Sequence, residues 1–197
     1  LSLQTRRHDL PPRVRRTGLS QDPARKAGFP PVFAPDARLL ILGSLPGDAS
    51  IARSRYYAHP QNNFWRLVGE VIGVDLAGMD YEARLEALTA NRIALWDVIA
   101  NAHRAGSLDA AIRQQRTNDL VGLIGGLPDL RAVAFNGGTA TKLGLKAVAA
   151  ASPDIERIAL PSSSSAHASL PFERKAAAWL ALRRPLGLVL ETKPSCS

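Results

Sequence analysis

Apolar and polar positions follow regular patterns from residue 38 onward, and these patterns predict the main elements of the fold. The run 39–42 is continuously apolar and ends in the Gly/Pro-containing segment 43–47, which is typical of a strand buried on both faces. The apolar residues within 64–72 then recur with the spacing of a helix that has one buried face. Asn62 lies where this helix should begin.

The same patterns predict a series of strands that alternates with helices. We expect further strands over 92–98, 131–135 and 155–160, helices over 81–90, 107–112, 117–124, 139–151 and 171–183, and a terminal strand or packed tail over 186–190. Thr117 or Asn118 is the expected cap of the helix that runs toward residue 124. Such alternation favours an α/β fold of three layers (α/β/α) with a central, mainly parallel four-stranded sheet.

Polar or glycine-rich residues follow each predicted strand. They are the segment 43–47, Asp97, Asn136 and the segment 162–167. Because ligands bind outside the carboxyl ends of strands in such sheets, we expect these residues to line one crevice, together with Tyr56, Tyr57 and Trp96. Aromatic faces, amides and a carboxylate suit a flat ligand with a polar edge, and a nucleic-acid base has both properties.

Charge and composition indicate the kind of partner. The 197 residues are ample for one domain, and a net charge of +8 with a pI near 10.4 favours a polyanion such as nucleic acid. We predict a basic, proline-punctuated arm over 1–35, one domain over 36–190 and a tail over 191–197. The arm either contacts DNA phosphates or is a solvated tail without function, and both readings stay open.

Several classes of site lack their sequence signatures. The one cysteine, Cys196, excludes a disulfide within the chain and a cluster that needs four thiolates. The four histidines lack metal-binding spacing, and neither GxGxxG nor GxxxxGK[ST] is present, so we expect no metal and no cofactor. With neither an apolar run of about 18 residues nor a signal peptide, we expect no membrane association and a cytoplasmic location.

Five blocks, in this order, carry a family resemblance: GSLPG, YYAHPQNNFWR, ALWDVIANAHRAGSLDAAI, FNGGTATKLG and LPSSSSAHA. Together they resemble the hypoxanthine-DNA glycosylase branch of the uracil-DNA glycosylase superfamily, over roughly residues 28–184. The resemblance implies a uracil-DNA glycosylase-like fold. It also implies a monofunctional DNA glycosylase of base excision repair, without metal or Schiff-base lyase step, which leaves an abasic site. Hypoxanthine is the first expected substrate, with uracil or xanthine as further candidates.

The resemblance also implies roles for individual residues. Asn62 occupies the position expected to hold the attacking water, and the segment 160–168 resembles a loop that enters DNA. The expected base-binding residues are Gly43, Ser44, Leu45, Tyr57, Phe64, Asp97 and Asn136, and those of the DNA-binding loop are Ser162, Ser163, Ser164 and His167. Two features depart from the wider superfamily: Leu45 stands where several branches have aspartate or asparagine, and Ser165 and His167 replace an expected proline and asparagine.

Each of these residues also has a purely structural interpretation. Asn62 is a good helix cap, Asp97 could pair with an arginine, and Asn136 suits a turn before Gly137. For the whole chain two alternatives remain: a non-catalytic module that binds damaged bases, and an enzyme of free nucleosides or nucleotides. The partner we expect is DNA, single- or double-stranded, bound by a monomer.

Overall fold

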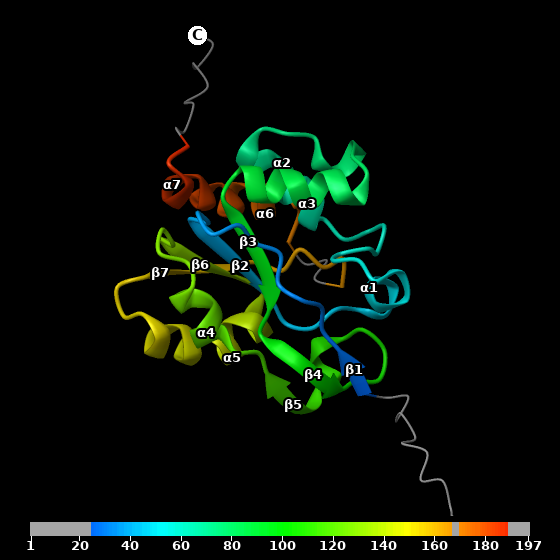
Figure 1. Cartoon of the computed structure of the whole chain (residues 1–197). Helices are drawn as coiled ribbons and strands as arrows, with labels where there is room; N and C mark the ends of the chain where they lie inside the picture. Colours follow the sequence, from blue (N-terminus) through cyan, green and yellow to red (C-terminus); the bar gives the residue numbers. More distant parts are fainter. Residues whose placement is uncertain (1–24, 167–169, 189–197) are drawn as a thin grey trace, which may run out of the picture.

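A parallel sheet of four strands forms the centre of the computed structural model, which describes residues 25–166 and 170–188. The strands are β2 (Leu39–Gly43), β3 (Ile93–Asp97), β6 (Ala132–Asn136) and β7 (Glu156–Leu160). Their spatial order is β3-β2-β6-β7, and all three pairings are parallel (Figure 1). Each strand matches a predicted one within two residues at either end.

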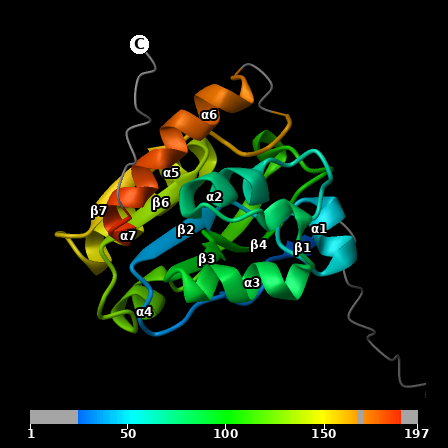
Figure 2. The same ribbon diagram turned by 90° about the horizontal axis from the view of Figure 1, so that it is seen from above.

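Helices cover both faces of this sheet, which confirms the predicted three-layer α/β/α fold (Figures 1 and 2). One layer contains α2 (Phe64–Ile72), α3 (Tyr81–Ala90), α6 (Phe172–Trp179) and α7 (Arg183–Leu186). The opposite layer contains α4 (Leu120–Gly125) and α5 (Gly138–Ala151). Two short elements lie in the connections: α1 (Asp48–Arg53) follows β2 in the chain, and the 3₁₀ turn η1 (Leu76–Gly78) connects α2 to α3.

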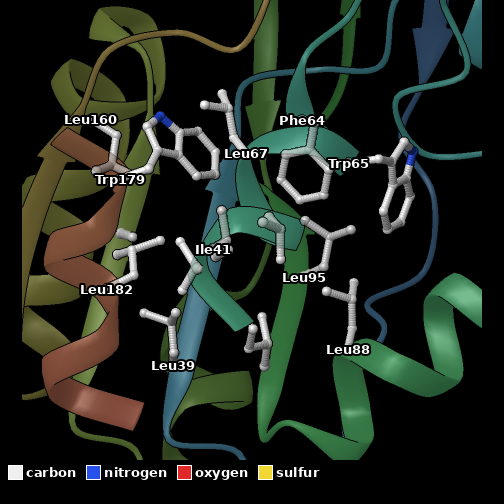
Figure 3. Packing of buried hydrophobic residues seen from close by; sticks show 14 of the residues in the cluster. Leu39, Ile41, Phe64, Trp65, Leu67, Leu88, Leu95, Leu160, Trp179 and Leu182 are labelled. Carbon is white, nitrogen blue, oxygen red and sulfur yellow. The ribbon is translucent and has the colours of Figure 1, made fainter. Parts of the chain in front are cut away.

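The apolar run of β2 explains why both faces are covered. Leu39 and Ile41 pack into the core beneath α2 and α6, whereas Leu40 and Leu42 pack into the core beneath α4 and α5. All four side chains are fully buried. Figure 3 shows Ile41 in the first of these cores, among side chains of α2, α6 and β3.

A second, antiparallel sheet was not predicted. It contains β1 (Arg25–Ala27), β4 (Ile99–His103) and β5 (Arg113–Thr117), in the order β1-β4-β5. The helix expected over 107–112 is wrong, because the chain forms only the 3₁₀ turn η2 (Asp109–Ala111) before it pairs with β4. Every residue of β5 is exposed, so this strand has no apolar pattern from which to predict it.

The predicted boundary between the arm and the domain also differs from the structure. Residues 25–35 belong to the domain, since β1 pairs with β4 and Val32 forms a bridge with Leu95. Residues 1–24 and 191–197, assigned to the arm and the tail, lie outside the described residues.

Some helix ends also differ from prediction. Asp119 caps α4 by accepting a hydrogen bond from the Gly122 N–H, whereas Asn118 donates its side-chain amide to the carbonyl of Asp97. The helix expected over 171–183 is divided into α6, the 3₁₀ turn η3 (Leu180–Leu182) and α7. Among residues 25–166 and 170–188, none of the helices has the length and apolar character that crossing a bilayer would need.

Candidate active site

A cavity of about 490 Å³ lies at the carboxyl ends of the parallel strands. Its lining comes from the turn 43–47 after β2, Asp97 at the end of β3, Asn136 at the end of β6 and residues 162–166 after β7. Tyr56, Tyr57, His59, Asn62 and residues 107–109 complete the wall. The structure therefore brings the four strand-end blocks together, as the alternation of strands and helices predicts.

Asp97 is a buried carboxylate at this cavity. Its side chain is 3% exposed, and its Oδ2 has no hydrogen-bond partner among the described residues. Its Oδ1 lies against Gly43, where a Cβ would come within 2.4 Å of this oxygen. Burial raises the pKa of Asp97 to about 7, the nearby Asp109 adds to the rise, and Arg104 opposes it. The carboxyl group therefore titrates near neutral pH.

The amide of Asn136 is committed to the protein. The Ser163 N–H donates to its Oδ1 at 2.8 Å, and its Nδ2 donates to the Ser163 Oγ at 2.9 Å and to the Tyr57 hydroxyl at 3.1 Å. These bonds use both amide protons and one lone pair of the oxygen. Asn136 lines the cavity as expected, but its edge is not free to read a base.

Tyr57 and Phe64 form a stacked pair beside the cavity. Their ring centroids lie 3.8 Å apart, with an angle of 11° between the planes. Tyr57 lines the cavity, whereas Phe64 is fully buried and is not part of the wall. The structure therefore does not bring Phe64 to the cavity wall, because the ring of Tyr57 stacks over it. Tyr57 has a φ of 51°, an unusual value for a bulky residue.

Asn62 combines its two predicted settings. It lines the cavity, and its Oδ1 accepts a hydrogen bond of 2.9 Å from the Phe64 N–H at the start of α2. The N-cap position itself belongs to Asn63, which makes no side-chain cap bond and does not line the cavity. The neighbouring amides therefore differ in exposure to the site.

Arg104 supports the site and was missed by the sequence analysis. Its side chain is 2% exposed and donates to the carbonyls of Leu45 (3.2 Å), Pro46 and Gly106 (3.1 Å). Asp109, whose Oδ1 lies 3.7 Å from the guanidinium, accepts a hydrogen bond of 2.8 Å from the Ser44 hydroxyl. Arg104 and Asp109 therefore hold the turn after β2 in place. Arg104 lies inside the block ALWDVIANAHRAGSLDAAI, but nothing in the pattern of residues indicated that it would contact this turn.

The serine-rich loop is held from behind by α6. Lys175 donates to the carbonyl of Ser164 at 3.2 Å, and the indole of Trp179 donates to that of Pro161 at 3.0 Å. Ser163 is 1% exposed and faces Asn136, so it is structural, whereas Ser162 and Ser164 are half-buried in the wall. The predicted contribution of His167 lies outside the described residues. Neither Lys175 nor Trp179 was predicted to have a part in the site.

The described residues offer few groups for metal or amine chemistry. Within 25–166 and 170–188 there is no cluster of three His, Cys, Asp or Glu side chains able to hold a metal ion. The lysines of these ranges are absent from the cavity wall, Lys175 included. The chemistry available at the wall is that of amides, hydroxyls, one imidazole and carboxylates.

Comparisons with known proteins agree with this arrangement. The sequence profile of the Uracil DNA glycosylase superfamily matches residues 30–183. A "Hypoxanthine DNA glycosylase" of Methanosarcina barkeri is 49% identical over 113 residues, which cover 57% of this chain and 72% of the relative. One of the same description from Methanosarcina acetivorans is 45% identical over 142 residues, which cover 72% of this chain and 88% of the relative.

A solved structure is similar over nearly its full length. It is the solution NMR structure of a protein from Methanosarcina acetivorans described as a candidate uracil DNA glycosylase. The two structures superpose with a TM-score of 0.73 and 42% sequence identity, over 83% of this chain and 99% of the other. The two proteins therefore share the fold.

Proposed function

This chain belongs to the uracil DNA glycosylase superfamily and to the family of its hypoxanthine DNA glycosylase relatives, and we propose that it hydrolyses the N-glycosidic bond of hypoxanthine in DNA. One observation carries this proposal: every residue of the cavity wall lies between 43 and 166, inside the segment 30–183 that matches the superfamily. The volume of about 490 Å³ is in the usual range of small-molecule sites, about 300–1,000 Å³. Uracil and xanthine are further candidate substrates.

Asn62 is the residue we assign to the attacking water. Its hydrogen bond from the Phe64 N–H orients the amide at the cavity wall, and this leaves a lone pair of Oδ1 and both protons of Nδ2. An amide is a weak base, so it would orient the water without deprotonating it. That is sufficient if the bond from the sugar to the base is largely broken before the water attacks, because an oxocarbenium-like sugar needs little activation of the nucleophile.

The rim of the cavity carries the proposed contacts to DNA. Ser162 and Ser164 lie on one loop of the wall, and Leu108, whose side chain is 60% exposed, lies on another. A base must leave the helical stack to enter such a cavity, and an apolar side chain can occupy the gap that it leaves. We assign Leu108 to this wedge, and Ser162, Ser164 and His167 to contacts along the strand.

The activity we propose is monofunctional and independent of metals. A lyase step through a Schiff base needs an amine at the sugar. Lys175 is the buried lysine beside the serine-rich loop, but its amine donates a hydrogen bond to the carbonyl of Ser164 from behind the wall. Because the proposed substrate is DNA, we expect the protein to act in the same compartment as the chromosome.

The test uses end-labelled oligonucleotides that each contain one hypoxanthine, uracil or xanthine, incubated with the protein and then cleaved at abasic sites with alkali. We expect cleavage that is fastest at hypoxanthine, unchanged by EDTA, and dependent on the alkali step. An oligonucleotide with adenine at the same position is the control. If folded protein binds the hypoxanthine oligonucleotide but releases no base, the chain is a binding module and the proposal is wrong.

A further inference from the structure

The hydrogen bonds around Asn136 fix the polarity of the Tyr57 hydroxyl. The Ser163 N–H donates to one atom of the Asn136 side chain, which identifies that atom as the oxygen and the other as the nitrogen. The nitrogen then donates to the Tyr57 hydroxyl at 3.1 Å. Burial raises the pKa of Tyr57 far above its ordinary value, so the phenol keeps its proton. Because the amide already donates to this oxygen, the Tyr57 proton points elsewhere and is available to an acceptor.

An acceptor stands beside this donor. The Tyr57 hydroxyl and the Asp97 Oδ1 both flank Gly43, at 2.8 Å and 2.4 Å from the position that a Cβ would take there. Gly43, Tyr57 and Asp97 all line the cavity. Glycine at this position leaves open the space between the two oxygens, which any side chain would fill. One donor and one acceptor therefore lie side by side at an open part of the wall.

Two other polar groups at the strand ends, Asn136 and Ser44, are less free to read a base. The Asn136 amide is used by Ser163 and Tyr57, and the Ser44 hydroxyl donates to Asp109. Asp97 Oδ2 is fully buried without a partner, so the charge or proton of this carboxyl is not satisfied within the described residues. Because Oδ2 is enclosed, a ligand in the cavity would contact this carboxyl through Oδ1, the oxygen beside Gly43.

Deamination reverses the hydrogen-bonding polarity of an adenine edge. Adenine presents a donor on its exocyclic nitrogen and an acceptor at ring N1, whereas hypoxanthine presents a carbonyl acceptor and an N1–H donor. We propose that Tyr57 and Asp97 distinguish hypoxanthine from adenine by this edge: the Tyr57 hydroxyl donates to the carbonyl, and the Asp97 Oδ1 accepts from the adjacent ring N–H. Adenine would instead place its exocyclic donor against the Tyr57 donor and its N1 acceptor against the Asp97 acceptor. Uracil differs from cytosine in the same way. Guanine and thymine also present a carbonyl beside a ring N–H, so this edge separates hypoxanthine from adenine and uracil from cytosine but does not separate xanthine from guanine.

This selection rests on the proposed glycosylase function and extends it to a substrate class and two specificity residues. The experiment compares oligonucleotides that carry hypoxanthine or N1-methylhypoxanthine, in which a methyl group replaces the N1 proton. Single-turnover base release is measured for the parent protein and for Asp97→Leu, which replaces the carboxylate with a branched side chain that has no acceptor. Asp129→Leu is the matched control, because it removes the same charge from an exposed residue outside the cavity wall.

We expect N1 methylation to slow the parent protein about 10- to 100-fold, the range for loss of a specific base contact. Asp97→Leu should slow hypoxanthine release by a similar factor but change N1-methylhypoxanthine release less than about threefold, since contacting groups are not additive. Asp129→Leu should retain the parent ratio between the two substrates. Equal losses on both substrates in Asp97→Leu would show that Asp97 acts elsewhere in the reaction, and the reading of N1–H would be wrong.

Tyr57→Phe tests the donor separately. It should lower the ratio of affinities for hypoxanthine and adenine oligonucleotides about tenfold, measured by competition binding, because only the carbonyl contact is lost. An unchanged ratio would contradict the donor assignment. The failures of the two proposals are distinguishable. A parent protein that cuts no lesion contradicts the glycosylase function, whereas one that cuts both hypoxanthines equally contradicts only the selection by Asp97.

Discussion

Asp97 connects stability with pH at the scale of a single residue. Its pKa is about 7 in the folded chain against an ordinary value of 3.8, so the folded state holds more protons than the unfolded state between these values. The free energy of unfolding should therefore fall as the pH rises from about 4 to about 7, by at most about 4 kcal/mol from this group. Asp97→Leu should lack this part of the pH dependence and be more stable at pH 8, as urea unfolding at several pH values would show.

The matched variant for this measurement is again Asp129→Leu, since Asp129 is exposed. It should follow the pH dependence of the parent protein. If Asp97→Leu is instead less stable than the parent at pH 8, the ionised carboxylate has a stabilising partner. The conclusion that ionised Asp97 destabilises the fold would then be wrong.

The activity should respond to the same titration in the opposite direction. Only the ionised carboxylate is a pure acceptor for a ring N–H, so hypoxanthine release should rise with pH through about 7. Burial contributes most to this pKa, Asp109 raises it further, and Arg104 lowers it. The nearby phenols of Tyr56 and Tyr57 keep their protons, because burial raises their own pKa values. A pH profile of single-turnover release is the measurement. Release that falls as the pH rises through 7 would instead indicate an acid that protonates the departing base.

The two roles of Asn62, which are to cap α2 and to hold the attacking water, can be tested separately. The next residue, Asn63, has the same side chain but does not line the cavity, so it provides a control. Asn62→Ser keeps an oxygen able to accept from the Phe64 N–H but shortens the side chain at the wall. We expect a change in the free energy of unfolding below about 1 kcal/mol and base release slower by about 100-fold or more, or about 3 kcal/mol. Asn63→Ser, the control, should leave both nearly unchanged. Near-parental release by Asn62→Ser would leave Asn62 with the structural role alone.

Sequence patterns predicted which residues lie at the site. They did not predict which groups each of these residues contacts. Asp97, Asn136 and Asn62 were placed at the cavity by the ends of strands and the start of a helix, which periodicity indicates. That the Asn136 amide is used internally depends on Ser163, 27 positions away. Phe64 is buried beneath the ring of Tyr57, with which it stacks. Contacts of this kind come from the folded chain, and local sequence does not carry them.

At the scale of elements, the segment 104–109 is held on both sides of an exposed leucine. Arg104 is buried against the turn 43–47, Lys26 donates to the carbonyl of Gly106, and the Ser107 hydroxyl accepts from the Asp48 N–H at 2.9 Å. Leu108 is thus displayed from an anchored segment at the rim of the cavity. A rigid apolar tip is suited to entering a base stack, because it loses little conformational freedom on insertion.

Leu108→Ala should therefore slow base release from duplex DNA about tenfold, while release from single-stranded DNA should change less than about twofold. Only the duplex requires a base pair to be opened and its gap filled. Val121→Ala is the control, because Val121 is 53% exposed but belongs to α4, outside the cavity wall. Single-turnover rates on both forms of the same hypoxanthine sequence decide the matter. Equal losses on the two would remove Leu108 from the wedge role.

Elements with a strong apolar period were predictable, and those held by backbone pairing were not. The apolar spacing over 64–72 predicted α2 with its observed limits, and β2 is continuously apolar as expected. In contrast, β5 is polar and fully exposed, and β4 and β1 have no clear alternation, so their pairing depends on partners up to 78 positions apart. Interpretation of residues 107–112 as a helix followed from a good capping serine, yet Ser107 receives its hydrogen bond from Asp48.

At the scale of the whole molecule, the domain begins nearer the amino end than predicted, at residue 25 or before it. Residues 1–24 contain five arginines, Arg6, Arg7, Arg13, Arg15 and Arg16, against two aspartates. Residues 25–35 instead belong to the domain: the Phe29 carbonyl accepts from the Trp96 indole at 2.9 Å, and the hydroxyl of Tyr56 donates to the Pro30 carbonyl at 3.2 Å. Tyr56 in turn is part of the cavity wall.

Two truncations should therefore behave differently. Removal of residues 1–24 should weaken DNA binding and reduce the slope of log K against log salt, by about one for each arginine that contacts a phosphate. The preference for hypoxanthine over uracil and adenine should remain, because these charges contact no base. Removal of residues 1–30 also deletes β1 and the carbonyls that hold Trp96 and Tyr56. It should lower the melting temperature and slow base release at every salt concentration.

Binding of labelled hypoxanthine oligonucleotides across a salt series, together with thermal melts, distinguishes the two effects. If removal of residues 1–24 alters the order of substrates, the arm reaches the base site and its contribution is more than charge.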